Sequence, residues 1–392
     1  MRDLEVAIAG FGGAGMAQYG HFRAIPGCRV RAIYDPKPAG LERARQAGAG
    51  GLLTDDFEAF LGAGIDLLAV CSPNPAHAEQ IVRALRAGIH VICEKPLASS
   101  LEECGRILEA ERASPSAILG VMHQMRFLPL YGRIREVVAR GDLGTISYLE
   151  GYYVHNVIRR VSAHDTWVFD TAPPPLLLSG CHFVDLARWL LDDEVEEVVG
   201  MGNHLAFPEY PESDLSVVLL RFRSGPIAKV VTAFGAGRPQ DHSVRILGTE
   251  RCIDNNLLLE KDGAVRSLTR PLWRHRLGER RSLRGRLGDV RRDLRHLKAM
   301  AAHGAFAALR RLYGRSESYG IASYPLRLYE HALAVRRCLS EFVDCVRTRR
   351  RPRSTGIDAA KTVATCLAGV EAYRTGETVP LARYWRPEFD GG

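Results

Sequence analysis

A short glycine-rich segment after the first apolar run constrains the fold of this chain more than any other feature. The segment reads GFGGAG, and it joins the run VAIA, which is typical of a buried strand, to a helix that we expect to begin near Met16. The spacing G-x-G-x-x-G permits a tight turn, close approach of a phosphate to the backbone, and a helix amino terminus aimed at that phosphate. We therefore predict a pyrophosphate site formed by Gly10, Gly12, Gly13, Ala14 and Gly15.

The second predicted strand supplies an acidic residue where a dinucleotide site requires one. The strand CRVRAIYD ends in Asp35, 20 residues after Gly15. A carboxylate there accepts hydrogen bonds from the hydroxyls of the adenosine ribose. We predict that the chain binds NAD, because Asp35 would repel a 2′-phosphate. Lys37, which we also place in the cofactor site, keeps NADP open as an alternative; a glycine turn without a ligand is the other alternative.

Strand and helix patterns alternate through the first third of the chain. IDLLAVCS and HVICEKP read as buried strands, and HAEQIVRALRAG between them reads as an amphipathic helix. This alternation predicts an α/β Rossmann domain with a doubly wound parallel sheet over residues 1–123. Residues 124–392 form the predicted second domain, an α+β unit in which strands such as DLSVVLLRF, PIAKVVTAF and RCIDNNLLLE build an open, mostly antiparallel sheet. From residue 324 the chain returns to helices, the last of which ends at Gly376.

Positive charge is concentrated in one stretch of the second domain. The whole chain has a formal net charge of +8, but residues 261–315 hold 14 Arg and 2 Lys against 4 acidic residues. We interpret residues 261–323 as a basic insertion with amphipathic helices. Packing on its own subunit or on a neighbour is the first interpretation; contact with an acidic surface, with anionic lipid or with a phosphorylated sugar stays open. Nucleic-acid binding is not expected, since no reading module accompanies the charge.

Other classes of protein are excluded by what the sequence lacks. Nine cysteines are scattered without a C-x-x-C pair, so neither a metal site nor a disulfide framework is expected. No apolar stretch has the length of a membrane span, and the first residues do not read as a signal peptide. We therefore expect a cytoplasmic protein.

Three segments resemble, in order and spacing, the Gfo/Idh/MocA family of glucose-fructose oxidoreductase, inositol dehydrogenase and rhizopine-catabolism proteins. They are AVCSPNPAHAEQ at 69–80, HVICEKPLA at 90–98 and SGCHFVDLARWLL at 179–191. Near the end of the chain, ETVPLARYW looks like the family's last strand. The resemblance implies a site in the cleft between the two domains, and a homodimer or homotetramer assembled through the sheet of the second domain.

The resemblance also implies which residues act. It makes Lys95, within E-K-P, a hydrogen-bond donor and proton-relay partner beside the reacting hydroxyl, and His182 the general base for oxidation. It further implies a cis peptide bond before Pro96. The family has an aspartate where this chain has Leu178, one helical turn before His182, so the tautomer and the pKa of the imidazole depend on another partner. Candidates for this partner are Asp165, Asp170, His164 and Tyr153. A lysine exposed at a strand end and a histidine of the core are the structural alternatives.

The remaining predicted site residues surround this pair. Those expected to contact the cofactor are Ser72, Asn74, His77, Glu94 and Lys95 itself. Those expected to contact the substrate are His123, Arg126, Tyr153 and Asp165, with pairing to a carboxylate as the alternative for Arg126. Asp185 is expected to be a structural hydrogen-bond partner.

Together these features predict an NAD(P)-dependent oxidoreductase that transfers hydride between nicotinamide and a secondary hydroxyl or ketone of a sugar, nucleotide sugar or cyclitol. Two alternatives stay open, because Leu178 and the APPP segment at 172–175 depart from the family pattern. One is a hidden-redox enzyme, namely a glycosidase, epimerase or lyase that recycles its NAD. The other is a cofactor-binding protein that has lost catalysis.

Overall fold

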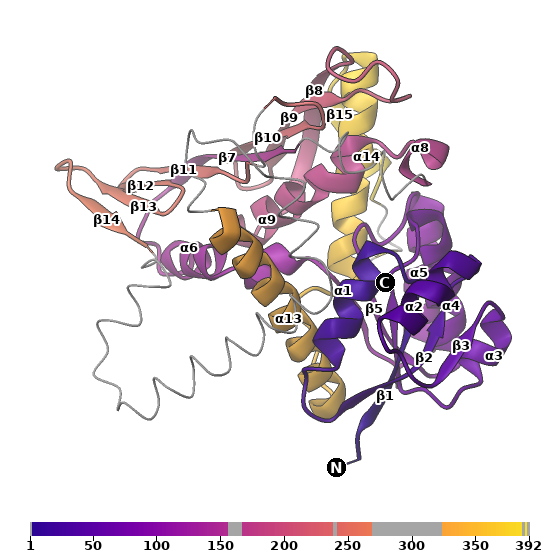
Figure 1. The fold of residues 1–392 in the computed structure, drawn as a ribbon. Coiled ribbons are helices and arrows are strands. Elements are labelled where there is room, and N and C mark those ends of the chain that lie inside the picture. The colour runs from indigo at the N-terminus through magenta and orange to yellow at the C-terminus, as the bar shows by residue number, and fades with distance from the viewer. Residues whose placement is uncertain (1, 156–166, 238–240, 269–323, 386–388, 390–392) are drawn as a thin grey trace, which may run out of the picture.

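The computed structural model describes residues 2–155, 167–237, 241–268, 324–385 and 389, with the backbone alone over 324–330. Figure 1 shows two sheets at opposite ends of the molecule, and the first third of the chain forms one of them. The first sheet is parallel and has the strand order β3-β2-β1-β4-β5-β6. Its strands are β1 (Leu4–Ala9), β2 (Cys28–Tyr34), β3 (Leu52–Thr54), β4 (Leu67–Val70), β5 (His90–Cys93) and β6 (Leu119–Val121).

Helices cover both faces of this sheet, as the doubly wound Rossmann prediction requires. Every residue of β4 and β5 is buried, which explains their unbroken apolar runs. The connecting helices are α1 (Gly13–Phe22), α2 (Pro38–Gln46), α3 (Phe57–Leu61), α4 (His77–Arg86) and α5 (Leu101–Ala113). The helix expected near Met16 begins earlier, at Gly13, because the glycines themselves form its first turn.

The second sheet has nine strands in the order β14-β13-β12-β11-β7-β10-β9-β8-β15. Only its β7–β10 pair is parallel, so the prediction of an open, mostly antiparallel sheet is confirmed. The strands are β7 (Ile146–Val154), β8 (Val195–Asn203), β9 (Leu215–Phe222), β10 (Ile227–Ala233), β11 (Val244–Gly248), β12 (Arg251–Asp254), β13 (Leu257–Glu260), β14 (Val265–Ser267) and β15 (Val379–Pro380).

One predicted strand of this sheet is a hairpin. RCIDNNLLLE reads as a single strand, but the structure divides it into β12 and β13, which pair with each other. Asn255 in the turn has a φ of 52°. Asparagine tolerates this left-handed conformation better than most residues, so the Asn-Asn pair provides the turn that the apolar pattern conceals.

Helices α6 (Pro129–Ala139), α9 (Cys181–Leu191) and α14 (Gly356–Thr375) belong to the second part of the chain, and α9 and α14 pack on one face of the second sheet. Gly151 of β7 permits this approach, since a Cβ atom there would lie 2.1 Å from the ring of Phe183 in α9. Helix α14 ends at Gly376, which has a φ of 75°, as predicted. The expected last strand is short, because β15 contains only Val379 and Pro380.

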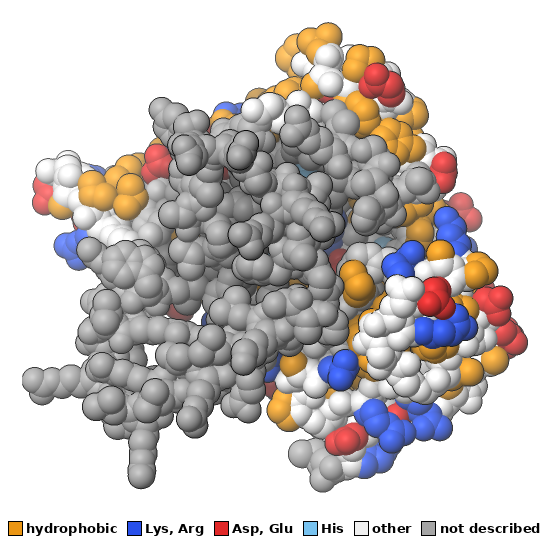
Figure 2. Space-filling model, in the orientation of Figure 1, with side chains coloured by type: hydrophobic (Ala, Val, Ile, Leu, Met, Phe, Trp, Pro, Cys, Tyr) orange, Lys and Arg blue, Asp and Glu red, His pale blue; other side chains and the backbone are white. Residues whose placement is uncertain are grey.

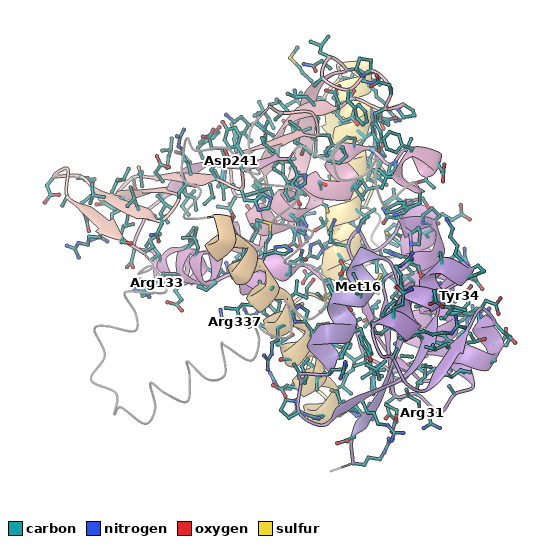
Figure 3. All side chains as sticks on the ribbon, viewed as in Figure 1. Met16, Arg31, Tyr34, Arg133, Asp241 and Arg337 are labelled. Atoms are coloured by element: carbon teal, nitrogen blue, oxygen red, sulfur yellow. The ribbon has the colours of Figure 1, made fainter. Side chains whose placement is uncertain are left out.

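The long helix α13 (Tyr324–Thr348) packs against the first sheet, although it lies near the carboxyl end of the chain. Figure 3 labels Met16 on α1 and Arg337 on α13, the two helices that lie side by side there. Phe342 of α13 contacts the first sheet at Gly120, where a Cβ atom would be 2.6 Å from its ring. The division of the chain after residue 123 stays a prediction.

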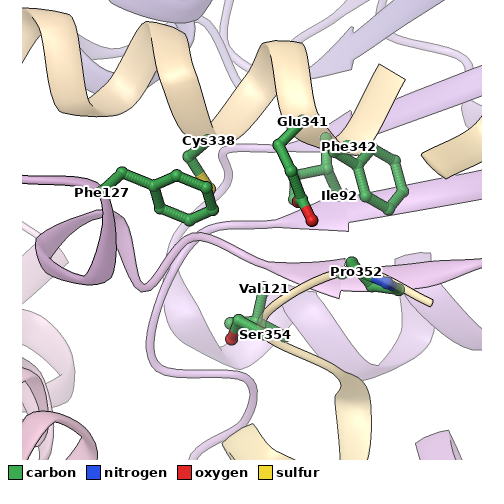
Figure 4. A pocket seen from close by; sticks show the side chains of 9 residues that line it. Ile92, Val121, Phe127, Cys338, Glu341, Phe342, Pro352 and Ser354 are labelled. Atoms are coloured by element: carbon green, nitrogen blue, oxygen red, sulfur yellow. The ribbon is translucent and has the colours of Figure 1, made fainter. Parts of the chain in front are cut away.

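A narrow pocket lies between α13 and the first sheet. Figure 4 shows its lining, which is largely apolar and includes Ile92, Phe127 and Phe342 together with the carboxylate of Glu341. Glu341 already accepts a hydrogen bond from the Arg353 backbone at 3.0 Å. None of the predicted site residues lines this pocket.

A buried ion pair connects the end of the first sheet to α9. Arg126, in the short helix η2 (Gln124–Phe127) after β6, donates two hydrogen bonds to Asp185 of α9, at 2.9 and 2.7 Å. Their side chains are only 3% and 1% exposed. Burial alone would raise the pKa of Asp185, but the charge and hydrogen bonds of Arg126, together with His123 and Arg188, outweigh it and lower that pKa. Arg126 also donates to the Arg353 carbonyl and to Asp358.

We expect Arg126→Met to destabilise the protein by about 3–5 kcal/mol, because it leaves the Asp185 carboxylate buried without its partner. Equilibrium unfolding in urea measures this loss. Arg133→Met is the matched control: Arg133 forms an exposed pair with Glu136, and such pairs contribute about 0–1 kcal/mol. Equal unfolding midpoints for the two variants would contradict the prediction.

Candidate active site

The residues predicted to bind the cofactor lie at the carboxyl ends of the parallel strands. Gly10 follows β1, Asp35 follows β2, Ser72 comes just after β4 and Glu94 follows β5. The Gly10 N–H donates to the Tyr34 carbonyl at 2.7 Å, which holds two of these ends together. Ligands of doubly wound sheets bind along this edge.

The glycine loop has the shape that a pyrophosphate site needs. Gly10 has a φ of 83°, and a Cβ atom on it would lie 2.7 Å from Ser72. A Cβ atom on Gly15 would lie 1.9 Å from the Gly10 carbonyl oxygen, so α1 packs directly on the turn. At Gly12 and Gly13 a Cβ atom would meet nothing within 4 Å, and no side chain caps the helix there. The backbone amides at this end therefore face open space.

Asp35 is held beside this loop by two backbone donors. Its side chain accepts hydrogen bonds from the Phe11 N–H at 2.8 Å and from the Lys37 N–H at 2.9 Å. Gly40 contributes space, since a Cβ atom there would lie 2.1 Å from the Asp35 carboxylate. Each carboxylate oxygen retains acceptor capacity, so the ribose contact of Asp35 stays a prediction, as does any role of Lys37.

The loop after β4 is pinned to the E-K-P segment by His77. The ring of His77 is fully buried, with its two nitrogens 2.9 Å from the carbonyl oxygens of Ser72 and Pro96. Burial lowers the pKa of His77, and these backbone contacts offset part of that effect. This geometry makes His77 a support of the loop. Asn74 is 4% exposed, and its Nδ2 atom has no hydrogen-bond partner among the described residues.

Lys95 links the end of the first sheet to the turn before α9. Its ammonium donates a hydrogen bond of 2.7 Å to the carbonyl oxygen of Leu178. Leu178 lies in a π-helical turn, η3 (Leu176–Gly180), directly before α9. The Lys95–Pro96 peptide bond is cis, as the family resemblance implied. The lysine therefore bonds to the main chain at the position where the family has an aspartate.

His182 lies in the first turn of α9, buried against an aromatic ring. Tyr153 of β7 stacks on it, with ring centroids 5.4 Å apart and an interplanar angle of 17°. Burial lowers the pKa of His182 well below 6.5, and the charges of Lys95 and of nearby histidines lower it further. The imidazole is therefore neutral near pH 7. Its Nδ1 atom has no hydrogen-bond partner within the described part of the chain.

Two more histidines surround Tyr153. His155, directly after the end of β7, and His242, before β11, have ring centroids 6.5 and 4.4 Å from that of Tyr153. Tyr153 and His155 are two positions apart in the sequence, but nothing in the sequence pairs either of them with His242.

His123 lies between this cluster and the ion pair. It is 2% exposed, and its Nδ1 atom lies 3.7 Å from Asp185. Burial lowers the pKa of His123 to about 4, although the Asp185 charge opposes the shift. Arg126, in contrast, directs its hydrogen bonds to protein acceptors, so the structure favours pairing over substrate contact for this residue.

The side chain of Leu178 packs against a small hydrophobic cluster formed by Val168, Phe207 and Tyr210. Leucine therefore joins an apolar contact where a carboxylate would require a polar one. Asp165 lies outside the described residues, as do positions 269–323 of the basic insertion.

Neither a metal centre nor a membrane span is evident in the described part of the chain. No group of three or more His, Cys, Asp or Glu side chains there is arranged to hold a metal ion. Likewise, none of the described helices combines the length and the apolar character that crossing a membrane requires.

Both parts of the chain match models of known protein families. Residues 4–123 match a family model described as an oxidoreductase family with an NAD-binding Rossmann fold, and residues 131–254 match the Gfo/Idh/MocA C-terminal domain. Together these matches span more than half of the sequence.

Individual relatives agree with the family match. The chain is 24% identical over 377 residues to scyllo-inositol 2-dehydrogenase (NAD⁺) of Bacillus subtilis, and the aligned region covers 94% of each sequence. It is 28% identical over 261 residues to myo-inositol 2-dehydrogenase of Thermotoga maritima, which covers 63% of this chain and 73% of that protein.

Solved structures share the whole fold. A scyllo-inositol dehydrogenase from Lactobacillus casei with bound NAD(H) and scyllo-inositol superposes with a TM-score of 0.73 at 18% identity, over 97% of this chain and 100% of that one. A myo-inositol 2-dehydrogenase from Lactobacillus plantarum gives 0.74 at 18% identity, over 97% and 99%. With both domain matches in order on one chain, this protein belongs to the Gfo/Idh/MocA family of NAD-binding oxidoreductases.

Proposed function

We propose that the protein is an NAD-dependent dehydrogenase that oxidises a secondary hydroxyl of a cyclitol or a related sugar to a ketone, or catalyses the reverse reduction. The observation that carries this proposal is the hydrogen bond from Lys95 to the Leu178 carbonyl. It holds the ammonium of Lys95, from the carboxyl edge of the first sheet, beside the turn that leads into the helix of His182. The relatives named as inositol dehydrogenases support a cyclitol substrate.

Lys95 would bind and polarise the substrate hydroxyl. An ammonium has three N–H donors, and the described residues take one of them, at Leu178. The donors that remain can hydrogen-bond to the oxygen of the reacting alcohol. A positive charge there lowers the pKa of the hydroxyl and stabilises the alkoxide character that develops as the C–H bond breaks.

His182 would accept the proton. Its ring is neutral and therefore able to act as a base, and its Nδ1 atom lacks a partner among the described residues. The stacked ring of Tyr153 would fix the imidazole plane. It would thus replace the carboxylate that the family has at the position of Leu178. The nicotinamide, when bound, accepts the hydride. His123 and Tyr153 would hydrogen-bond to other hydroxyls of the substrate.

We also propose that the protein is a homo-oligomer assembled through the outer face of the second sheet. Cross-strand partners share a face, and the face opposite α9 and α14 presents Met201, Leu219 and Leu247, which are 79%, 40% and 45% exposed. Figure 2 shows hydrophobic side chains gathered over the end of the sheet near β8 and β15, and at the tip near β13 and β14.

Lys95→Met is expected to lower kcat for oxidation of the best substrate among myo-inositol, scyllo-inositol and related sugars by about 10²–10⁴-fold, because the alkoxide loses its stabilising charge. Nicotinamide absorbance and chromatography of the sugar should be recorded together. Lys261→Met, which removes an exposed lysine paired with Glu250, is the control. Unchanged turnover in Lys95→Met would refute the role of Lys95, and sugar conversion without net nicotinamide reduction would indicate the hidden-redox alternative.

The acid limb of the kcat/KM profile should lie well below pH 6.5. A base with an ordinary histidine pKa loses activity as the pH falls through that value, whereas burial and the Lys95 charge lower the pKa of His182 and keep it neutral in more acid solution. Initial rates measured across about pH 5–9 test this expectation. An acid limb centred at or above pH 6.5 would speak against His182 as the base.

Leu219→Arg should convert the oligomer into smaller species, since it introduces a charge into the proposed contact face. Size-exclusion chromatography with light scattering measures the mass of each species. Leu52→Arg is the matched control, because Leu52 is similarly exposed, at 37%, but lies in the first sheet. A monomeric unsubstituted protein, or an unchanged mass for Leu219→Arg, would contradict the proposed contact face.

A further inference from the structure

Gln18 lies near the carboxyl edge of the first sheet, where the cofactor is expected, but it belongs to none of the motifs described above. It is on α1, one helical turn after Gly15, and its side chain is 1% exposed. Its Nε2 group donates a hydrogen bond of 2.7 Å to Oε1 of Glu94. The close packing of Gly15 on the Gly10 carbonyl brings α1 near enough to β5 for this contact.

The environment of Glu94 makes this hydrogen bond important. Burial raises the pKa of Glu94, and the Lys95 charge and the Gln18 hydrogen bond, which favour the ionised carboxylate, offset part of that rise. The thiols of Cys71, Cys93 and Cys338 also interact with Glu94, and they supply no positive charge. Glu94 nevertheless remains only partly buried, and it directly follows β5 at the edge where the cofactor is expected.

Gln18 also has an atom that the fold itself does not satisfy. Its Oε1 is buried and has no hydrogen-bond partner among the described residues. A buried amide with an orphaned oxygen is costly, and a leucine or methionine would fill the same space without that cost. What the amide provides and an apolar side chain would not is the hydrogen bond to the Glu94 carboxylate.

We propose that Gln18 is a positioning residue that orients the Glu94 carboxylate to accept a hydrogen bond from the nicotinamide-side ribose of NAD. The hydrogen bond joins the glycine-loop helix to the E-K-P segment, so one amide couples the pyrophosphate end of the site to its reactive end. This inference rests on the proposed function, because it requires that NAD bind along the carboxyl edge of the first sheet.

Binding of NAD and of ADP to the full-length protein, measured by isothermal titration calorimetry, tests the proposal. ADP occupies the pyrophosphate and adenosine positions but has no second ribose. Gln18→Met is expected to weaken NAD binding by about tenfold or more and to leave ADP binding unchanged, since only NAD uses the oriented carboxylate. Gln80→Met is the matched control: Gln80 is also buried and has an unpartnered Oε1 among the described residues, but it lies on α4.

The outcomes separate the possible failures. Unchanged NAD affinity in Gln18→Met would overturn the positioning role. Equal losses of affinity for NAD and ADP would also overturn it and would indicate that Gln18 has a purely structural role. If the unsubstituted protein bound neither ligand, the proposed function itself would fail. Gln18→Glu is the second variant if the methionine protein does not fold. It keeps the side-chain shape but sets one carboxylate against another, and it should give the same selective loss of NAD binding.

Discussion

The buried pair of Arg126 and Asp185 is the contact on which the active-site arrangement depends. Both side chains are almost fully excluded from water, so neither charge could be buried there at acceptable cost without the other. Asp185 lies one helical turn after His182 on α9, and Arg126 lies just after β6 of the first sheet. The ion pair therefore fixes His182 relative to the carboxyl edge of the first sheet. The further hydrogen bonds of Arg126 to Arg353 and Asp358 connect the segment before α14 and the first turn of α14 to the same arrangement.

Much of this arrangement can be predicted from local patterns. The glycine loop, the E-K-P segment and the G-C-H-x-x-D stretch each specify a short backbone geometry, and the sheet places them along one edge. Contacts between distant segments cannot be read in this way. The packing of α13 on the first sheet joins residues about two hundred or more positions apart, and amphipathic periodicity shows that a helix has an apolar face without showing which surface covers it.

The missed site residues illustrate the same limit. Gln18 is an ordinary helix residue by sequence, and only the close packing of α1 brings its amide to Glu94. His242 lies between strands, and its contact with Tyr153 depends on the register between β11 and β7. The hairpin at Asn255 was concealed for a different reason, because the apolar residues on both sides of the Asn-Asn pair can be read as one longer strand.

The replacement of an aspartate by Leu178 changes the electrostatics of the site but retains its connection. A main-chain carbonyl accepts the Lys95 hydrogen bond, which preserves the link between the end of the first sheet and the turn before α9, yet it carries no full charge to neutralise the ammonium. The positive charge of Lys95 helps to keep His182 unprotonated. A neutral imidazole near an ammonium is a workable pair for alcohol oxidation, since an ammonium can stabilise an alkoxide and a neutral imidazole can accept a proton. The sequence change is thus compatible with catalysis, provided that stacking on Tyr153 supplies the orientation that a carboxylate would otherwise give.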